Sequence, residues 1–444
     1  MFLKQINKAY WVMGILLYLL FVPSSIYAKE QTFIFICSFI SFVLFSVAIL
    51  ESFRREESFF TKRHLAFSVF LISLVQVLIF SLLSFSIDGD LFLFSKADAI
   101  VYYNNSIKMS EVSFWESINY CIKNYLFDDW GAFIWFSVLF RISKSLLFVK
   151  LIHVIIGVGS SLLLFDIGYY FMPRRYAYMA SLTFFIASFT AAFHTVFLKE
   201  SIFIFLVIAA FHTFYRFLHK RNTLYLIMAF FLSATIAFFR LPVAIILFGA
   251  FVITLILMYT KGIITIVLGF IFFTILITSS YTAITYERYL RAGDVDLIIE
   301  RKEELAMGGG IVKHAADPLA ALIGPFPSIA VKKISNTSLN AAGLFYRLLL
   351  AVPFFLGTYY VFRYRQQKLY PLIIFFLFNA VGVAISVKGL EFRLTYPHLS
   401  MAYVVAFWWL AKYDYKKMPL KLSNVVIYGW IIIAFALSLI WNLR

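Results

Sequence analysis

The charged residues of this chain stand mainly at the ends of apolar segments, and their types suit chemistry on a phosphate-bearing substrate. Asp98 lies in the first long polar segment, close to Asp88 and Asp90. A carboxylate there can accept the proton of an acceptor hydroxyl. Arginine and lysine neutralise phosphate, and arginine does so through two parallel hydrogen bonds. We therefore expect Asp98 to lie over a lipid-borne substrate at the boundary between membrane and water.

The composition and the apolar runs of the chain predict a helical membrane protein, and its helices must position these residues. Of the 444 residues, 63% are hydrophobic and 14% are charged, whereas soluble domains are about half apolar and a quarter charged. Apolar runs of about 17–25 residues recur, and each can cross ~30 Å of hydrocarbon. The runs are continuous rather than alternating, which favours helices over a barrel. The expected fold is all-α, a polytopic integral membrane protein with about 13 transmembrane helices in one domain, residues 1–444.

The basic residues of the short loops predict the orientation, because lysine and arginine concentrate on the cytoplasmic side. They place the N-terminus in the cytoplasm and two long loops outside, residues 88–145 and 285–340. In the first loop, residues 107–126 carry apolar side chains at helical spacing but are too polar to span, which predicts an interfacial amphipathic helix. The basic short segments are residues 54–64, 174–175, 219–221, 261, 363–368 and 412–421.

This topology gathers charged residues from separate connections at the outer face. Lys199 and Glu200 form a turn between two apolar runs, where Gly, Asn or Ser is the usual choice. Arg240 directly follows two phenylalanines, so its guanidinium needs an anionic partner near the bilayer surface. A polyprenyl phosphate carries its charge at this level, and sugar transfer from it needs both a base and cations. The gathered residues are Asp98, Asp128, Asp129, Lys199, Glu200, Arg240, Glu391 and Arg393.

Other partners and cofactors find little support in the sequence. The net charge of +17 is explained largely by basic cytoplasmic loops, so no nucleic-acid partner is expected. Two cysteines define neither a disulfide framework nor a metal site. No spacing among Asp88, Asp90, Asp98 and Asp128 specifies a metal. We expect no cofactor, although a divalent metal stays open.

Short motifs at these positions resemble those of a known class. They are Asp98 followed by Tyr102 in the first outer loop, the turn Leu198-Lys199-Glu200-Ser201, the late segment Glu391-Phe-Arg393-Leu-Thr-Tyr-Pro397, and Gly324-Pro-Phe-Pro327. The pattern resembles the GT-C class of multispanning glycosyltransferases and the related O-antigen-type polysaccharide polymerases. The chain departs from some members in having one carboxylate at Asp98 instead of an Asp-Glu pair, and it lacks the Trp-Trp-Asp signature of oligosaccharyltransferases.

The resemblance implies roles for these residues. Asp98 would be the catalytic base, and Tyr102 would shape the sugar pocket. The expected phosphate-binding residues are Lys199, Arg240 and Arg393, with Glu200 and Glu391 orienting them or contacting sugar hydroxyls, and Asp129 as a further substrate-binding residue. The basic loop 285–340 would be a lid that recruits anionic substrate.

The implied function is glycosyl transfer from a polyprenyl-phosphate or pyrophosphate carrier to a glycan or lipid acceptor. It would take place at the outer face of a bacterial inner membrane, in cell-surface polysaccharide biosynthesis. Three alternatives stay open: a repeat-unit polymerase for O-antigen or capsule, a flippase for lipid-linked oligosaccharides, and an assembly subunit without chemistry. A flippase should carry ionisable residues near mid-membrane, and Lys150, His153 and Asp166 are the residues of this kind.

Overall fold

The computed structural model describes residues 2–25, 29–54, 57–92, 96–125, 127–187, 190–259, 327, 329, 341–385, 392–416 and 421–443. Within these ranges the chain is all-helical, without strands, which confirms the expected fold class. The longer helices are α1 (Phe2–Ser25), α2 (Lys29–Arg54), α3 (Lys62–Asp88), α4 (Lys96–Glu111), α5 (Phe114–Asn124), α6 (Trp130–Ile142), α7 (Leu146–Tyr169), α8 (Arg174–Ala187), α10 (Glu200–Lys220), α11 (Thr223–Tyr259), α16 (Ala341–Arg363), α17 (Tyr370–Ile385), α18 (Phe392–Lys416) and α19 (Lys421–Leu443). Short helical pieces are η1 (Glu57–Phe59), η2 (Phe127–Asp129), α9 (Thr190–Thr195) and η3 (Gln367–Leu369).

Seven of the described helices are long and apolar enough to cross a membrane. They are α1, α2, α3, α7, α10, α11 and α16. The expected count of about 13 crossings and the orientation stay predictions. The proposed lid, residues 285–340, lies almost wholly outside the described residues.

Helix α11 is a hairpin of two helical arms. Arg240 interrupts the helix with an extended backbone (φ −165°, ψ 93°). The ring centroids of Phe230 and Phe248 are 4.6 Å apart, whereas a straight helix would separate residues so far apart in sequence by ~27 Å. Pro242 follows the break, in the first turn of the second arm. Proline is tolerated there because the backbone N–H groups of a helix's first turn have no acceptor within the helix. The chain therefore folds back on itself at Arg240.

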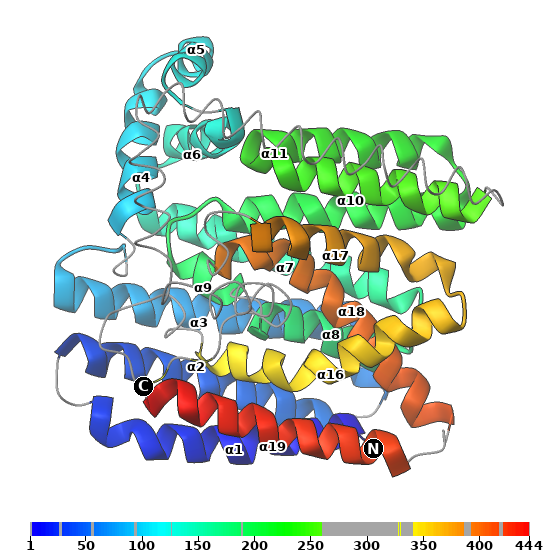
Figure 1. The fold of residues 1–444 in the computed structure, drawn as a ribbon. Helices are drawn as coiled ribbons and strands as arrows, with labels where there is room; N and C mark the ends of the chain where they lie inside the picture. Colours follow the sequence, from blue (N-terminus) through cyan, green and yellow to red (C-terminus); the bar gives the residue numbers. More distant parts are fainter. Residues whose placement is uncertain are drawn as a thin grey trace.

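The long helices lie side by side, and α4 runs across one end of them (Figure 1). We call this the α4 end of the bundle. The two chain termini lie towards opposite ends of the helices.

The predicted single helix over residues 107–126 is wrong, because two helices occupy this range. Helix α4 ends at Glu111 and α5 begins at Phe114. The Ser113 hydroxyl accepts a hydrogen bond from the Glu116 backbone N–H (3.3 Å), and the Ser113 N–H donates to the Glu116 carboxylate (2.8 Å). This reciprocal cap starts a new helix.

Gly157 on α7 makes room for a histidine from α9. A Cβ atom at residue 157 would lie 2.0 Å from Cε1 and 2.4 Å from Nε2 of the buried His194 ring. Small residues let helices approach closely inside a membrane.

We expect Gly157→Ala to destabilise the protein by about 1–3 kcal/mol, because the added methyl overfills a packed interior. The measurement is thermal unfolding of the detergent-purified chain. Gly429→Ala on α19 is the matched control, since a Cβ there meets no atom within 4 Å. Equal melting temperatures for the two variants would contradict the packing account.

Cysteine labelling tests the orientation. Cys37 and Cys121 are buried free thiols and can be replaced by serine. A cysteine at exposed Lys123 on α5 should react with an impermeant reagent in intact cells, whereas one at exposed Arg63 on α3 should react only after lysis. The reverse pattern would place the α4 end in the cytoplasm.

Candidate functional site

Five of the predicted site residues come together at the α4 end, and we call them the polar cluster: Tyr102, Asp129, Lys199, Glu200 and Arg240. The Tyr102 hydroxyl donates to Asp129 Oδ1 at 3.1 Å, and Lys199 Nζ forms an ion pair with the same oxygen. Arg240 Nη2 lies 3.6 Å from Glu200 Oε1. The cluster therefore holds two ion pairs built from residues far apart in the sequence.

Helix ends and turns position these side chains. Asp129 directly precedes α6, and Glu200 lies in the first turn of α10, where the helix dipole favours a negative charge. Arg240 stands at the apex of the α11 hairpin. Gly131 lets that apex approach, because a Cβ at residue 131 would lie 2.7 Å from the Phe239 ring. Asp129, Lys199, Glu200 and Arg240 are thus placed by element boundaries, whereas Tyr102 lies within α4.

The electrostatics of Asp129 favour an ionised carboxylate. Burial alone would raise the pKa of Asp129, but the charge and hydrogen bond of Lys199, the hydrogen bond from Tyr102 and the charge of Arg240 lower it. The net result is a pKa below the usual value. Because the Arg240 charge reaches Asp129, the two ion pairs form one electrostatic unit.

Tyr102 is held in its protonated form. Its pKa is raised well above the usual value, first by burial and then by the negative charges of Asp129, Glu200 and Asp98. A phenol that keeps its proton is a permanent hydrogen-bond donor at neutral pH. Tyr102 can therefore orient Asp129 but cannot serve as a base.

Glu200 is the most deeply buried acid of the cluster. Its side chain is 1% exposed, and neither carboxylate oxygen accepts a hydrogen bond from the part of the chain that the structure describes. Arg240 supplies the compensating charge, while its guanidinium carbon also lies 5.4 Å from the centre of the Phe203 ring. An ionised carboxylate in this position depends on a nearby cation, so Arg240 and Glu200 depend on each other.

Asp98 lies on the first turn of α4, four residues before Tyr102, with an exposed side chain. Its charge contributes to the raised pKa of Tyr102, which places it within electrostatic reach of the cluster. Its role as the base stays a prediction.

The remaining predicted residues are not placed relative to the cluster. Glu391 lies outside the described residues. Arg393 begins α18, but its side chain, like that of Asp128 on η2, is outside the described part. Metal ligation finds no support in the described ranges, where no group of three or more His, Cys, Asp or Glu residues could hold an ion.

Aromatic rings pack against Tyr102 of the polar cluster. The Tyr102 ring is 5.2 Å from Phe133 and 5.8 Å from Phe136, and Phe136 is 4.2 Å from Phe197 (ring centroids). The centroid of the Phe136 ring also lies 5.7 Å from the centroid of the His153 ring. These rings lie between the polar cluster and a second group of buried polar residues, on α7 and α9.

That second group contains Lys150, His153 and His194, all fully buried. Lys150 Nζ donates to the Ser81 hydroxyl at 3.0 Å and to the Leu91 carbonyl at 2.7 Å. His194 Nδ1 lies 3.2 Å from the Ser73 hydroxyl. Neither ring nitrogen of His153 has a hydrogen-bond partner among the described residues. Ionisable residues inside a membrane are costly and usually functional.

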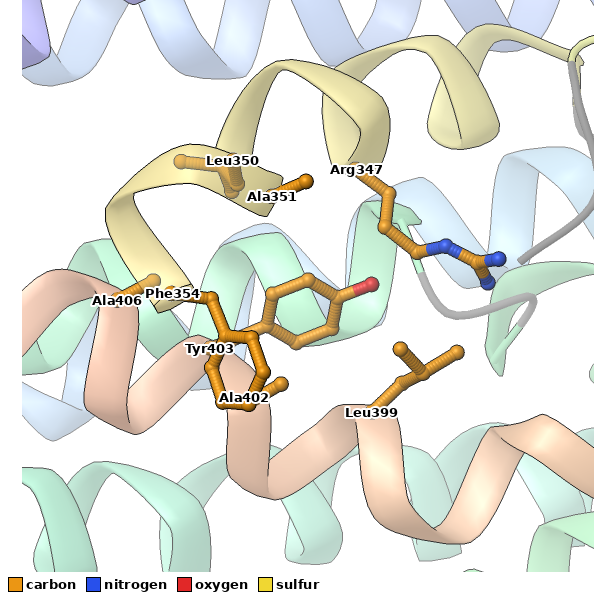
Figure 2. Close-up of a pocket in the computed structure, with 8 residues that line it drawn as sticks. All are labelled: Arg347, Leu350, Ala351, Phe354, Leu399, Ala402, Tyr403 and Ala406. Carbon is orange, nitrogen blue, oxygen red and sulfur yellow. The ribbon is translucent and has the colours of Figure 1, made fainter. Parts of the chain in front are cut away.

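Arg347 was missed by the sequence reasoning. It is 3% exposed on α16, and its guanidinium and the Tyr403 hydroxyl point towards the same end of a cavity between α16 and α18 (Figure 2). An arginine within an apolar run was the available signal. The cavity has a volume of about 20 Å³, which holds about one water molecule and no sugar. The other lining residues are Leu350, Ala351, Phe354, Leu399, Ala402 and Ala406.

No family model and no curated protein matches the chain, so these comparisons assign it to no family.

Proposed function

We propose that this chain is a membrane glycosyltransferase that uses a sugar carried on polyprenyl phosphate or pyrophosphate. The observation that supports the proposal best is the convergence of Asp129, Lys199, Glu200 and Arg240 with Tyr102 at one end of an apolar helix bundle. A lipid carrier places its charge at this level of a membrane, and its tail needs the apolar surroundings that the helices provide.

The two cations of the cluster suit the departing phosphate. Lys199 and Arg240 are already oriented by Asp129 and Glu200, so little ordering remains when an anion arrives. Preorganised cations stabilise charge that develops on the leaving group. In the proposed reaction the acceptor hydroxyl loses its proton to Asp98, its oxygen bonds to the sugar, and the bond between sugar and phosphate breaks with the electron pair leaving on the phosphate.

The proposed reaction takes place at the outer face of a bacterial inner membrane, as a step in the synthesis of a cell-surface polysaccharide. The acceptor would be a glycan or a lipid. Polymerisation of whole repeat units for O-antigen or capsule uses the same bond exchange, with a longer glycan on the carrier. Residues of the cluster would serve both reactions.

A flippase for lipid-linked oligosaccharides is the second candidate, and the buried group on α7 and α9 favours it. Lys150, His153 and His194 are ionisable residues within or against a membrane-length helix, as expected along a transport path. Such a protein would move the carrier without breaking its bond to the sugar.

Deletion of the gene separates the two candidates. Loss of a transferase should leave an unextended lipid-linked acceptor that an enzyme added from outside can digest in intact spheroplasts. Loss of a flippase should leave a completed lipid-linked glycan that is protected until the membrane is opened. Complementation with the wild-type gene is the control, and the second pattern would contradict the proposed transferase.

A further inference from the structure

A pair of cations lies at the end of the bundle opposite the polar cluster. Helix α10 begins at Glu200 in the cluster and ends at Lys220, ~30 Å away along the helix. Arg216 and Lys220 lie in its last turns, one helical turn apart, and so share a face. They are therefore well separated from the proposed reaction site.

The aromatic ring of Tyr225 lies beside both cations. The Arg216 Cζ atom is 5.1 Å and the Lys220 Nζ atom 5.8 Å from the centroid of this ring, which belongs to the first turn of α11. Next along the chain, Arg221 Cζ lies 5.3 Å from the centroid of Tyr259. Cation–π contacts hold such side chains in place without neutralising them.

Asp166, a carboxylate on α7, has other partners. Asp166 accepts a hydrogen bond from Lys62 Nζ at 2.7 Å and lies 3.7 Å from His212 Nε2. Within the described ranges, no ion pair joins Arg216 or Lys220 to an acid. Two oriented positive charges thus remain available to an anion.

An apolar stripe begins at Leu224, one residue before Tyr225. Leu224, Ile227, Met228 and Phe231 are 57%, 63%, 43% and 70% exposed. Their spacing of three, four and seven residues puts them on one face of the first arm of α11. The stripe follows the first arm of α11 from the end that carries Tyr225 towards the Arg240 apex.

We propose that Arg216 and Lys220 bind the phosphate of an anionic phospholipid, with its acyl chains along the Leu224–Phe231 stripe. Arginine forks the phosphate oxygens and lysine adds a point charge. The exposed stripe favours a lipid over a soluble anion, because only a lipid covers the apolar surface as well. This inference does not depend on the proposed glycosyl transfer.

The test measures lipid binding by the purified full-length chain in detergent, using native mass spectrometry and thermal unfolding. Dioleoyl phosphatidylglycerol should bind and stabilise the protein more than dioleoyl phosphatidylcholine does. Arg216→Gln/Lys220→Gln should weaken phosphatidylglycerol binding by about tenfold. The single variant Lys220→Gln, at an exposed position, should weaken it by a smaller factor and guards against misfolding of the pair.

The matched control is Lys108→Gln/Lys123→Gln, which removes two exposed positive charges at the α4 end. It should leave the preference for phosphatidylglycerol unchanged. Equal loss in the control, no preference between the two lipids, or unaltered binding by both Arg216/Lys220 variants would overturn the proposal. Stabilisation by inorganic phosphate equal to that by phosphatidylglycerol would overturn it as well, since the stripe would then contribute nothing.

Discussion

Replacing Asp98 by asparagine is expected to lower sugar transfer by ~10²–10⁴-fold, the usual contribution of a general base. The amide keeps the size of the carboxyl group but cannot accept the proton of the acceptor hydroxyl. Because Asp98 is exposed on the first turn of α4, we expect the yield and the melting temperature of the protein to stay near wild type.

The measurement is glycan extension on a polyprenyl-linked acceptor, normalised to monodisperse detergent-extracted protein. Glu111→Gln is the control, because Glu111 is a carboxylate on the same helix, 63% exposed, whose described ion pair is with Lys144 at 3.3 Å. It should keep full activity. Normal activity per folded molecule in Asp98→Asn would remove Asp98 from the reaction.

Replacing Lys199 by methionine is expected to lower both stability and transfer. The change leaves Asp129 without its ion-pair partner, and breaking a fully buried pair costs ~3–5 kcal/mol. Asp129 keeps 32% exposure against 9% for Lys199, so solvent reduces the expected loss to about 2–3 kcal/mol. Transfer should fall further than stability explains, because the methionine cannot neutralise phosphate.

The double variant Asp129→Asn/Lys199→Met separates these two effects. Removing both charges eliminates the uncompensated carboxylate, so the melting temperature should recover towards wild type. Activity should stay low, since the phosphate-binding cation is still missing. Recovery of activity together with stability would show that the pair is purely structural.

The sequence predicted that these residues gather at one end of the helices, but not which of them pair. Asp129, Lys199, Glu200 and Arg240 stand at the ends of apolar runs. The basic short loops predict the orientation of those runs, and this orientation places the four residues on the same side. That Lys199 pairs with Asp129 while Arg240 pairs with Glu200 depends on how η2, α10 and the α11 apex pack. Packing of this kind has no local signal in the chain.

Of two further features, one had a local signal in the sequence and the other did not. Apolar spacing continued through residues 107–126, yet the cap formed by Ser113 and Glu116 divided the range into two helices. The motif of Ser followed three residues later by Glu was present, and it outweighed the periodicity. Arg347 was visible within an apolar run, but only the structure places its guanidinium and the Tyr403 hydroxyl at one cavity. Local capping was readable from the sequence, whereas the contact between α16 and α18 was not.

The most direct test of the central proposal follows the carrier itself. The purified chain is mixed with lipid-linked glycans extracted from membranes of its source cells. Mass spectrometry then measures two products, the extended glycan and the released carrier. The proposal predicts that each extended glycan appears with one free polyprenyl phosphate or pyrophosphate, and that Arg240→Gln lowers both products together. Contradiction would come from a monodisperse wild-type chain that releases no carrier from any of these donors, or from unchanged release by Arg240→Gln.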